Sequence, residues 1–283
     1  MSDISLNKIK NLLFATVLML SFFSCKNEDK AAEERLSQAQ KLTNSGLYSA
    51  AKLQIDSIRS LYPNSYKVVK KAVLLFREVE RLEQSRNSIF CDKAIAELTA
   101  KSKELQSDFV FEKNAEYQEI GYWVLPNQRV ERNLRRSYLR CCVSERGEMM
   151  LTSVYCGSRR IDFNAIRVIT TDGIFAETLE VPYDGGTNFQ FVDEGMTSQI
   201  VTYARKKENG VSGFIRLYAH QNIKVEYLGG KPFSYTLDEE TKKAVLKTYA
   251  LSQVMSDLHR YQQEKKVADA KLIYLAKKNA KTN

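Results

Sequence analysis

Residues 137–155 read SYLRCCVSERGEMMLTSVY, two largely apolar runs on either side of a polar turn at Gly147. Short runs of β-branched, aromatic and other apolar residues, bounded by polar residues and glycine, are typical of neighbouring antiparallel strands. We therefore expect strands at Ser137–Ser144 and Met149–Tyr155, joined by a hairpin turn at Gly147. This hairpin predicts that the middle of the chain is β-rich.

The same pattern extends over residues 113–236, where glycine-containing turns separate short apolar runs. Six further strands are predicted there: Ala165–Thr170, Ile174–Val181, Phe189–Val192, Gln199–Lys206, Gly213–Ala219 and Ile223–Leu228. Asn209-Gly210 is the clearest hairpin signal, because this pair of residues favours the tight turn between adjacent strands. About eight short strands indicate an antiparallel β-sandwich or an open barrel.

A helical segment precedes the β-rich part, in residues 31–63. The turn and second helix of a tetratricopeptide repeat carry small, aromatic and proline residues at fixed spacing, and this chain has matching residues: Gly46, Tyr48, Ala51 and Pro63, with Ile55 and Ile58 at the packing positions. The segment resembles one such repeat, although Arg35 and Gln38 stand where its first helix needs large apolar residues. Because an array requires at least about three repeats, the resemblance implies a single helical hairpin.

Two longer helices are predicted from apolar residues that are alternately three and four positions apart. The first seam consists of Val68, Ala72, Leu75, Val79, Leu82, Arg86 and Ile89, and the second of Leu251, Val254, Leu258, Tyr261, Lys265, Ala268, Leu272 and Leu275. Such seams need partners. We expect the C-terminal helix to pack on the N-terminal arm as an antiparallel pair. The alternative is a homodimeric coiled coil or contact with another protein partner.

The first 30 residues have the pattern of an export signal. Lys8 and Lys10 precede the apolar run Leu12–Phe23, which is shorter than the roughly 20 residues of a membrane-spanning helix. Ser24 and Cys25 follow it and resemble the lipobox of bacterial lipoproteins, in a relaxed form similar to that of Bacteroidota-type bacteria. The resemblance implies cleavage after Ser24, a lipid on Cys25 and attachment to the outer membrane, facing either the periplasm or the cell surface. The alternatives are an ordinary cleaved signal and an uncleaved anchor in which Cys25 has no special role.

These patterns together predict an α+β protein in four parts. A lipoprotein signal peptide occupies residues 1–24, a lipidated tether and helical arm residues 25–112, a β-rich head residues 113–236, and a C-terminal heptad helix residues 237–283. The long C-terminal helix is expected to pack on the N-terminal helical arm.

The sequence lacks the motifs of common catalytic and nucleotide-binding sites. Its two histidines, His220 and His259, lie far from the cysteines, and no paired C-x-x-C spacing indicates a metal site. We therefore expect no catalytic residues, no metal, no cofactor and no enzymatic activity.

Four cysteines follow Cys25: Cys91, Cys141, Cys142 and Cys156. We expect most of them to be small buried side chains. Because export leads to a compartment that permits disulfides, a bond from Cys156 to Cys141 or Cys142 across the predicted hairpin is the alternative.

Two groups of residues are candidates for ligand binding. The chain carries a net charge of +9, and arginines are concentrated just before the first predicted hairpin. The candidate anion-binding residues are Arg129, Arg132, Arg136 and Arg140, whose planar guanidinium groups suit phosphate and carboxylate ligands. Trp123 and Tyr122 are candidates for stacking on a ligand, with packing between the helical and β parts as the other interpretation.

The sequence therefore predicts a membrane-anchored envelope lipoprotein with a non-catalytic binding or scaffolding role. A surface lipoprotein that binds or processes glycans is the alternative. We expect contact with a membrane through the N-terminal lipid and no binding to nucleic acid, because the protein is expected outside the cytoplasm.

Overall fold

The computed structural model describes residues 28–116, 118–204 and 206–280. The predicted signal peptide, residues 1–24, and the predicted lipid attachment site, Cys25, lie outside the described residues. The chain divides into two compact units, Met1–Asp92 with Glu264–Asn283 and Lys93–Gln263, which we call the helical unit and the β-unit. Helices α3 (Tyr66–Gln106) and α5 (Glu239–Ala280) each contribute residues to both units.

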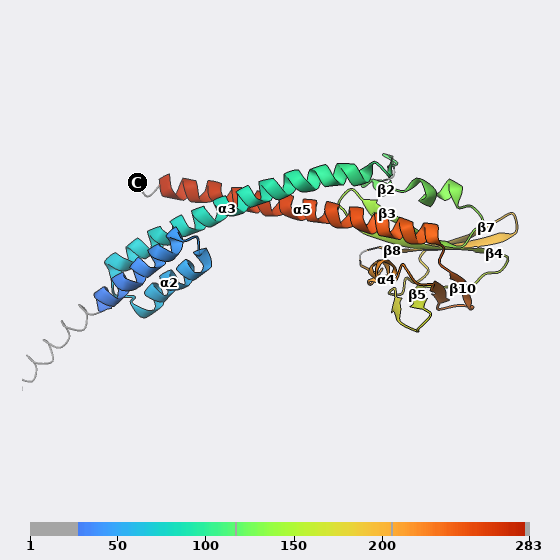
Figure 1. Cartoon of the computed structure of the whole chain (residues 1–283), viewed down its shortest axis with the longest axis horizontal. Helices are drawn as coiled ribbons and strands as arrows, with labels where there is room; N and C mark the ends of the chain where they lie inside the picture. The colour runs from blue at the N-terminus through green and yellow to red at the C-terminus, as the bar shows by residue number, and fades with distance from the viewer. Residues whose placement is uncertain (1–27, 117, 205, 281–283) are drawn as a thin grey trace, which may run out of the picture. The chain divides into compact units, whose positions relative to one another are not determined.

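The helical unit begins with the predicted helical hairpin, which is confirmed. Helix α1 occupies residues 28–44, Gly46 takes a positive φ of 73° in the turn, and α2 spans Tyr48–Leu61 (Figure 1). The apolar faces of α1, α2 and the first part of α3 meet in one core: Ala32, Leu36, Ala39, Ala51, Ile55, Ile58, Val68, Ala72 and Val79. Ala51, Ile55 and Ile58 fill this core as their spacing predicted.

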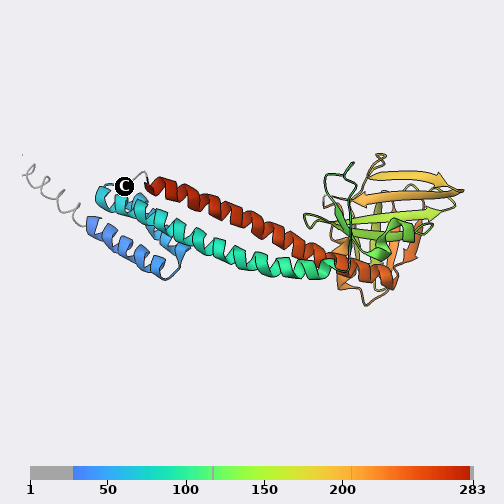
Figure 2. The ribbon, with the colours of Figure 1, turned by 90° about the horizontal axis from the view of Figure 1, so that it is seen from above.

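Helix α5 packs on α3, as predicted, and the two helices run side by side in Figure 2. Polar pairs within the helical unit show that the two helices are antiparallel: Lys271–Glu80, Lys265–Asp92 and Asp269–Ser88. The predicted α5 seam is confirmed, because each of its eight residues is buried or half-buried.

The prediction for the end of the α3 seam is wrong, however. Arg86 and Ile89 are exposed, whereas Ser88 and Cys91 are buried. A straight helix drifts relative to a strict seven-residue repeat, so the buried stripe moves to neighbouring positions along the helix.

The β-unit contains ten strands, within its described residues, in two antiparallel sheets. The six-stranded sheet has the order β1-β2-β3-β4-β8-β7, with β1 Val110–Glu112, β2 Tyr122–Val124, β3 Tyr138–Ser144, β4 Met149–Gly157, β8 Met196–Tyr203 and β7 Asn188–Asp193. The four-stranded sheet has the order β10-β9-β5-β6, with β10 Phe233–Thr236, β9 Ile223–Leu228, β5 Ala165–Thr170 and β6 Phe175–Glu177. Both sheets contribute to one core, together with α4 (Val211–Leu217) and α5.

The hairpin that connects β3 to β4 is confirmed, and its turn packs closely on α5. Gly147 has a φ of 85°, and a Cβ there would overlap the backbone of Met255 and Ser256. Ser252 and Ser256 donate hydrogen bonds to the Gly147 carbonyl at 2.6 and 2.8 Å. Glycine is therefore required at this turn for two reasons, its backbone conformation and the close approach of the helix.

One predicted strand and its hairpin are wrong. Gly213–Ala219 does not form a strand, because α4 covers most of this segment. Asn209-Gly210 is followed by that helix: the Glu208 carboxylate accepts hydrogen bonds from the N–H groups of Gly210 and Ser212 at the helix start. Val211 and Ile215, four residues apart, are the buried face, a helical spacing that the glycine-rich context obscured.

Other strand boundaries differ from those expected. Within the predicted Ile174–Val181, only β6 (Phe175–Glu177) is a strand, and β1, β2 and β10 were not predicted. These are segments of three or four residues, too short to show an alternating pattern, so the pairing partners decide them. The strands Ala165–Thr170 and Ile223–Leu228 have the predicted bounds.

Candidate ligand-binding groove

The two faces of the six-stranded sheet have different surroundings. Side chains alternate between the faces of a strand. The inward side chains, such as Leu139 on β3, Leu151 on β4 and Val201 on β8, lie in the core with the second sheet and α5. The outer face carries the alternate residues and bears a groove.

The groove has a volume of about 330 Å³ and lies between the outer face and the loop that precedes β3. The loop contributes Val130, Asn133, Leu134, Arg135 and Arg136 to the lining. The sheet contributes Tyr138 and Arg140 from β3, Met150, Thr152, Val154 and Cys156 from β4, Phe189 and Phe191 from β7, and Ser198, Ile200 and Thr202 from β8. The volume lies at the small end of the range for small-molecule sites, about 300–1,000 Å³.

The strand register arranges these outer residues in rows across the sheet. One row is polar: Arg140, Thr152 and Thr202 are successive partners on β3, β4 and β8. The next row is apolar: Tyr138, Val154, Ile200 and Phe189. A third row contains Cys156, Ser198 and Phe191. The groove floor therefore changes from polar to apolar between one row and the next, which lies two residues further along each strand.

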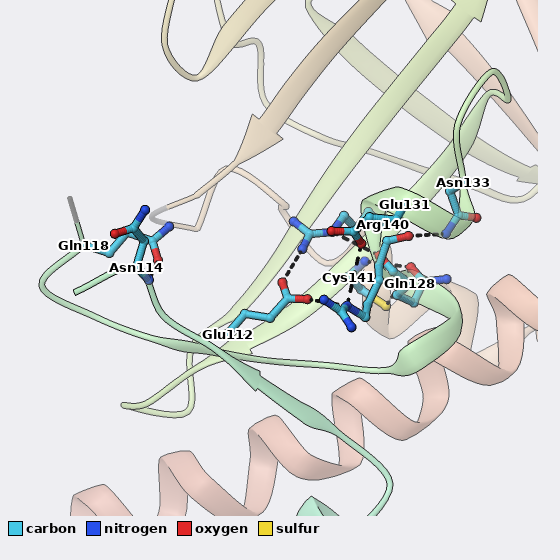
Figure 3. A network of polar contacts seen from close by, with 9 residues as sticks. Glu112, Asn114, Gln118, Gln128, Glu131, Asn133, Arg140 and Cys141 are labelled. Carbon is cyan, nitrogen blue, oxygen red and sulfur yellow. Dashed lines mark hydrogen bonds and ion pairs between the residues drawn. The ribbon is translucent and has the colours of Figure 1, made fainter. Parts of the chain in front are cut away.

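A network of buried polar groups holds the loop against the edge of β3 (Figure 3). The side-chain oxygen of buried Gln128 accepts a hydrogen bond from the backbone N–H of Cys141 at 3.1 Å. The backbone carbonyl of Gln128 accepts one from Nε of Arg140, also at 3.1 Å. Asn133 donates from Nδ2 to the carbonyls of Asn127 and Arg129, both at 2.8 Å. These bonds satisfy backbone groups that lack a strand partner and keep the loop in one conformation.

Glu112 on β1 bridges two of the predicted anion-binding arginines. Its Oε1 lies 3.1 Å from Nε of Arg129, and its Oε2 lies 3.3 Å from Nη2 of Arg140 (Figure 3). Glu131 is a weaker second partner of Arg129, because their charged atoms are 3.7 Å apart. One carboxylate is thus shared by two guanidinium groups.

The other two predicted anion-binding residues lie in different surroundings. Arg136 lines the groove, and its Nη2 lies 2.8 Å from Oδ2 of Asp238. Arg132 is exposed and lies outside the lining. The structure therefore brings Arg136 and Arg140 to the groove, connects Arg129 to Arg140 through Glu112, and leaves Arg132 apart.

Trp123 and Tyr122, the predicted stacking residues, lie on β2 and outside the groove lining. Trp123 is half-buried against the core, and its ring is 5.0 Å from that of Phe111, centroid to centroid. Partial burial, with the nearby Cys142 and Glu148, raises the pKa of Tyr122. Trp123 thus packs within the β-unit, and its two predicted roles, stacking on a ligand and packing between the helical and β parts, stay predictions.

Arg135 belongs to the same arginine-rich stretch of the sequence but was not among the four candidates, and sequence reasoning missed the apolar part of the lining. Arg135 forms an ion pair with Glu194, in the turn between β7 and β8. A signal was present in β4, where Met150 and Val154 are apolar although they alternate with the core residues Leu151 and Tyr155. Apolar residues at both alternating positions indicate that both faces of a strand are covered.

Cys141, Cys142 and Cys156 form no disulfide bond. In the register, Cys141 lies opposite Leu151, five residues along β4 from Cys156. At about 3.3 Å per residue, the distance is much greater than a disulfide spans. The alternative of a bond from Cys156 to Cys141 or Cys142 is therefore wrong. Cys91, Cys141 and Cys142 are buried, as expected for structural cysteines.

No group of metal-binding side chains is found among residues 28–116, 118–204 and 206–280. Both histidines, His220 and His259, are exposed. In the same described residues, no helix combines the length and the apolar character needed to cross a membrane. Comparison with protein-family models, curated proteins and solved structures finds no match to this chain.

Proposed function

We propose that the protein is a lipid-anchored envelope protein whose β-unit binds a small ligand in the outer groove without transforming it. The observation that carries this proposal is the composition of the lining, which combines an apolar floor with three arginines. Pockets of this kind, mostly apolar with a few placed polar groups, are typical of ligand sites.

The chemistry of the lining favours binding over turnover. Burial raises the pKa of Tyr138, despite the opposing effect of Arg140 and Arg136, so its hydroxyl stays protonated near neutral pH. A guanidinium group is always charged in proteins and cannot act as a general base. Hydroxyl and guanidinium donors with fixed positions can orient a ligand, and this is the role that we assign to them.

Support for the lipid anchor comes from the sequence at Cys25, with its preceding apolar run. A processed lipoprotein carries more than one acyl chain, and such an anchor holds a protein on a membrane far longer than a single chain does. Mass spectrometry of the N-terminus from membrane fractions should find a diacylglyceryl group on Cys25. An unmodified Cys25 in a membrane-free protein would contradict the anchor and leave the groove proposal standing.

The groove proposal is tested by filling the groove. Ile200→Trp places a large ring in the apolar row, whereas Val192→Trp adds the same ring on β7 at a position that is 71% exposed and outside the lining. With the neutral fluorescent probe N-phenyl-1-naphthylamine, the wild type and the Val192 variant should bind alike, and the Ile200 variant should bind much more weakly. Equal binding by all three proteins, each shown to be folded by circular dichroism, would contradict the proposal.

A further inference from the structure

The described lining of the groove carries positively charged side chains and no negatively charged ones. Among its sixteen residues, all of them in the described part of the chain, Arg135, Arg136 and Arg140 are cationic and none is a carboxylate. The rest are apolar or carry hydroxyl, thiol or amide groups. Taking the proposed binding function as given, we propose that the ligand is an anionic amphiphile with a single hydrocarbon chain, whose carboxylate or phosphate head lies beside Arg140.

Of the three arginines in the lining, Arg140 is the one whose positive charge is least neutralised by neighbouring carboxylates. Arg135 and Arg136 each have a carboxylate of their own, in Glu194 and Asp238. Arg140 shares Glu112 with Arg129, and the second carboxylate near Arg129, Glu131, is largely exposed and beyond hydrogen-bond distance. An anionic head beside Arg140 therefore completes the neutralisation of this pair of arginines.

The Arg140 guanidinium is also oriented for a ligand. Its Nε donates to the Gln128 carbonyl, and its Nη2 donates to Glu112. These two bonds lock the side chain and leave Nη1 without a partner among the described residues. A guanidinium group held in this way loses little conformational entropy when it binds an oxyanion.

Hydroxyl groups extend this polar end of the groove. Thr152 and Thr202 lie beside Arg140 in the same row, with their hydroxyl oxygens 3.2 Å apart in a mutual hydrogen bond. Only one of the two protons is used in that bond, so the other can be donated to an anion. The row thus combines a cation with a hydroxyl donor, the groups that a carboxylate or phosphate accepts from.

The apolar row accounts for the hydrocarbon chain. Tyr138, Val154, Ile200 and Phe189 form a continuous strip next to the polar row. Above it, Val130 and Leu134 on the loop are 51% and 68% exposed, high values for apolar side chains at the rim of a groove. Exposed apolar groups that gather around a concavity mark binding surfaces. A volume of about 330 Å³ suits one chain better than an extended peptide.

The test compares ligands that share a chain and differ in the head. Dodecanoate, dodecyl phosphate and dodecanol are each used to displace N-phenyl-1-naphthylamine from the full chain. We expect both anions to bind at least about tenfold more tightly than the alcohol, as one charge-assisted hydrogen bond predicts. The ratio between the two anions then identifies the preferred head group.

Three variants locate the head. Arg140→Gln should lower the affinity for both anions about tenfold and leave that for dodecanol unchanged. Arg146→Gln, in the exposed β3–β4 turn, is the matched control and should have no effect. Thr152→Val replaces a hydroxyl group with a methyl group of similar size and should weaken anion binding even if Arg140→Gln disturbs the loop.

Each contrary result has a distinct meaning. If dodecanol binds as tightly as the anions, the ligand class is wrong and the groove function stands. If no amphiphile displaces the probe from a protein that binds it, the amphiphile proposal is wrong; if the probe does not bind at all, both proposals are wrong. If Arg132→Gln weakens anion binding as much as Arg140→Gln, the head lies on the loop surface and the assigned position is wrong. Tighter displacement by an acidic peptide would identify a protein ligand and overturn the proposal.

Discussion

Arg135 and Glu194 form an ion pair that connects the loop above the groove to the turn between β7 and β8. Both residues have a positive φ, 61° for Arg135 and 46° for Glu194. Glu194 is followed by Gly195 with a φ of 80°, and two successive positive values are what a tight two-residue hairpin turn requires. The two side chains thus meet where two constrained turns face each other beside the groove.

Removing this ion pair should change the rates of ligand exchange in the groove more than the stability of the fold. The side chains are 63% and 66% exposed, and an exposed pair contributes at most about 1 kcal/mol to stability. Glu194→Gln should therefore change the free energy of unfolding by less than about 1 kcal/mol. In stopped-flow measurements, it should speed both association and dissociation of the fluorescent probe, and high salt should bring the wild type towards the same rates. Glu180→Gln, at another exposed carboxylate, is the control; identical rates in all proteins would contradict this prediction.

Asp238 caps the start of α5 and should make stability depend on acid pH. It accepts the N–H of Thr241 at 2.7 Å and pairs with Arg136. Partial burial raises the pKa of Asp238, but the hydrogen bonds from Thr241 and the charge of Arg136 together outweigh it and hold the pKa below its usual value. A lowered pKa in the folded state stabilises the protein above the usual carboxyl pKa, and this contribution is lost as the pH falls below about 5.

Two substitutions at this position separate the cap from the charge. Asp238→Ala should cost about 1 kcal/mol at pH 7, because a capping residue is lost. Asp238→Asn keeps an acceptor for the Thr241 N–H and should cost less, while it reduces the loss of stability in acid. Urea unfolding at several pH values measures both effects, and an Asn variant with the acid dependence of the wild type would disprove the assignment.

Gln199 should be important for the stability of the β-unit. Its buried amide donates to the Phe163 carbonyl at 2.8 Å and to Oδ1 of Asn188 at 2.9 Å, and it accepts the Phe163 N–H at 3.2 Å. Gln199→Leu leaves the buried Phe163 N–H and Oδ1 of Asn188 without a partner, while the Phe163 carbonyl keeps only the longer bond from Nδ2 of Asn188, at 3.3 Å. The substitution should cost about 3 kcal/mol. Gln253→Leu, at an exposed position of α5, should change stability by less than about 0.5 kcal/mol. Comparable denaturation midpoints for the two variants would be inconsistent with this role.

Gly230 is required because another segment approaches it closely. A Cβ at this position would overlap the carbonyl oxygens of Ile161 and Asp162, which are backbone atoms that cannot move aside easily. Gly230→Ala should therefore destabilise the protein by about 3 kcal/mol, the upper range for overpacking. Gly186→Ala is the matched control, because its Cβ would meet only Oδ1 of Asp184, at 3.9 Å. Thermal unfolding measures the loss of stability in each variant. An equal loss in both variants would contradict the close approach at Gly230.

The cysteines should differ sharply in reactivity. Burial raises the pKa of Cys141 to about 12 and that of Cys142 to about 11, so both remain protonated at pH 8. Because the thiolate is the reactive form, iodoacetamide should modify them only slowly. Cys156 is half-exposed in the groove lining and should react faster. Peptide mapping by mass spectrometry distinguishes each site, and bound dodecanoate should protect Cys156; faster labelling of Cys141 would contradict the buried arrangement.

Local patterns predicted the elements that have long, regular repeats. The helical spacing of Ile55 and Ile58, the α5 seam and the β3–β4 hairpin all rest on neighbours within a few residues. The strand predicted at Gly213–Ala219 was wrong because its apolar residues fit a short helix as well as a strand. The hydrogen bonds from the N–H groups of Gly210 and Ser212 to Glu208 favour the helix. Strands of three residues, such as β1, have no periodicity of their own and exist because β2 pairs with them.

The candidate site was predicted only in part. Arg136 and Arg140 do line the groove, but the arginine-rich stretch gave no indication that Glu112 binds Arg129 and Arg140 together or that Arg132 lies apart. The apolar lining on β7 and β8 was not assigned to a site. Its residues are separated from the loop by up to about seventy positions in the chain, from Val130 to Thr202.

The amino-acid sequence by itself determined the helical and β parts, the apolar helix seams that need a partner and the pattern at Cys25 that predicts a lipid anchor. Those features depend on residue spacing within single segments, where the periods of helix and strand are directly visible. Only the tertiary structure decided the groove, its rows of polar and apolar residues and the shared carboxylate of Glu112. These depend on strand order and register, which are set by packing between distant segments and not by any one of them.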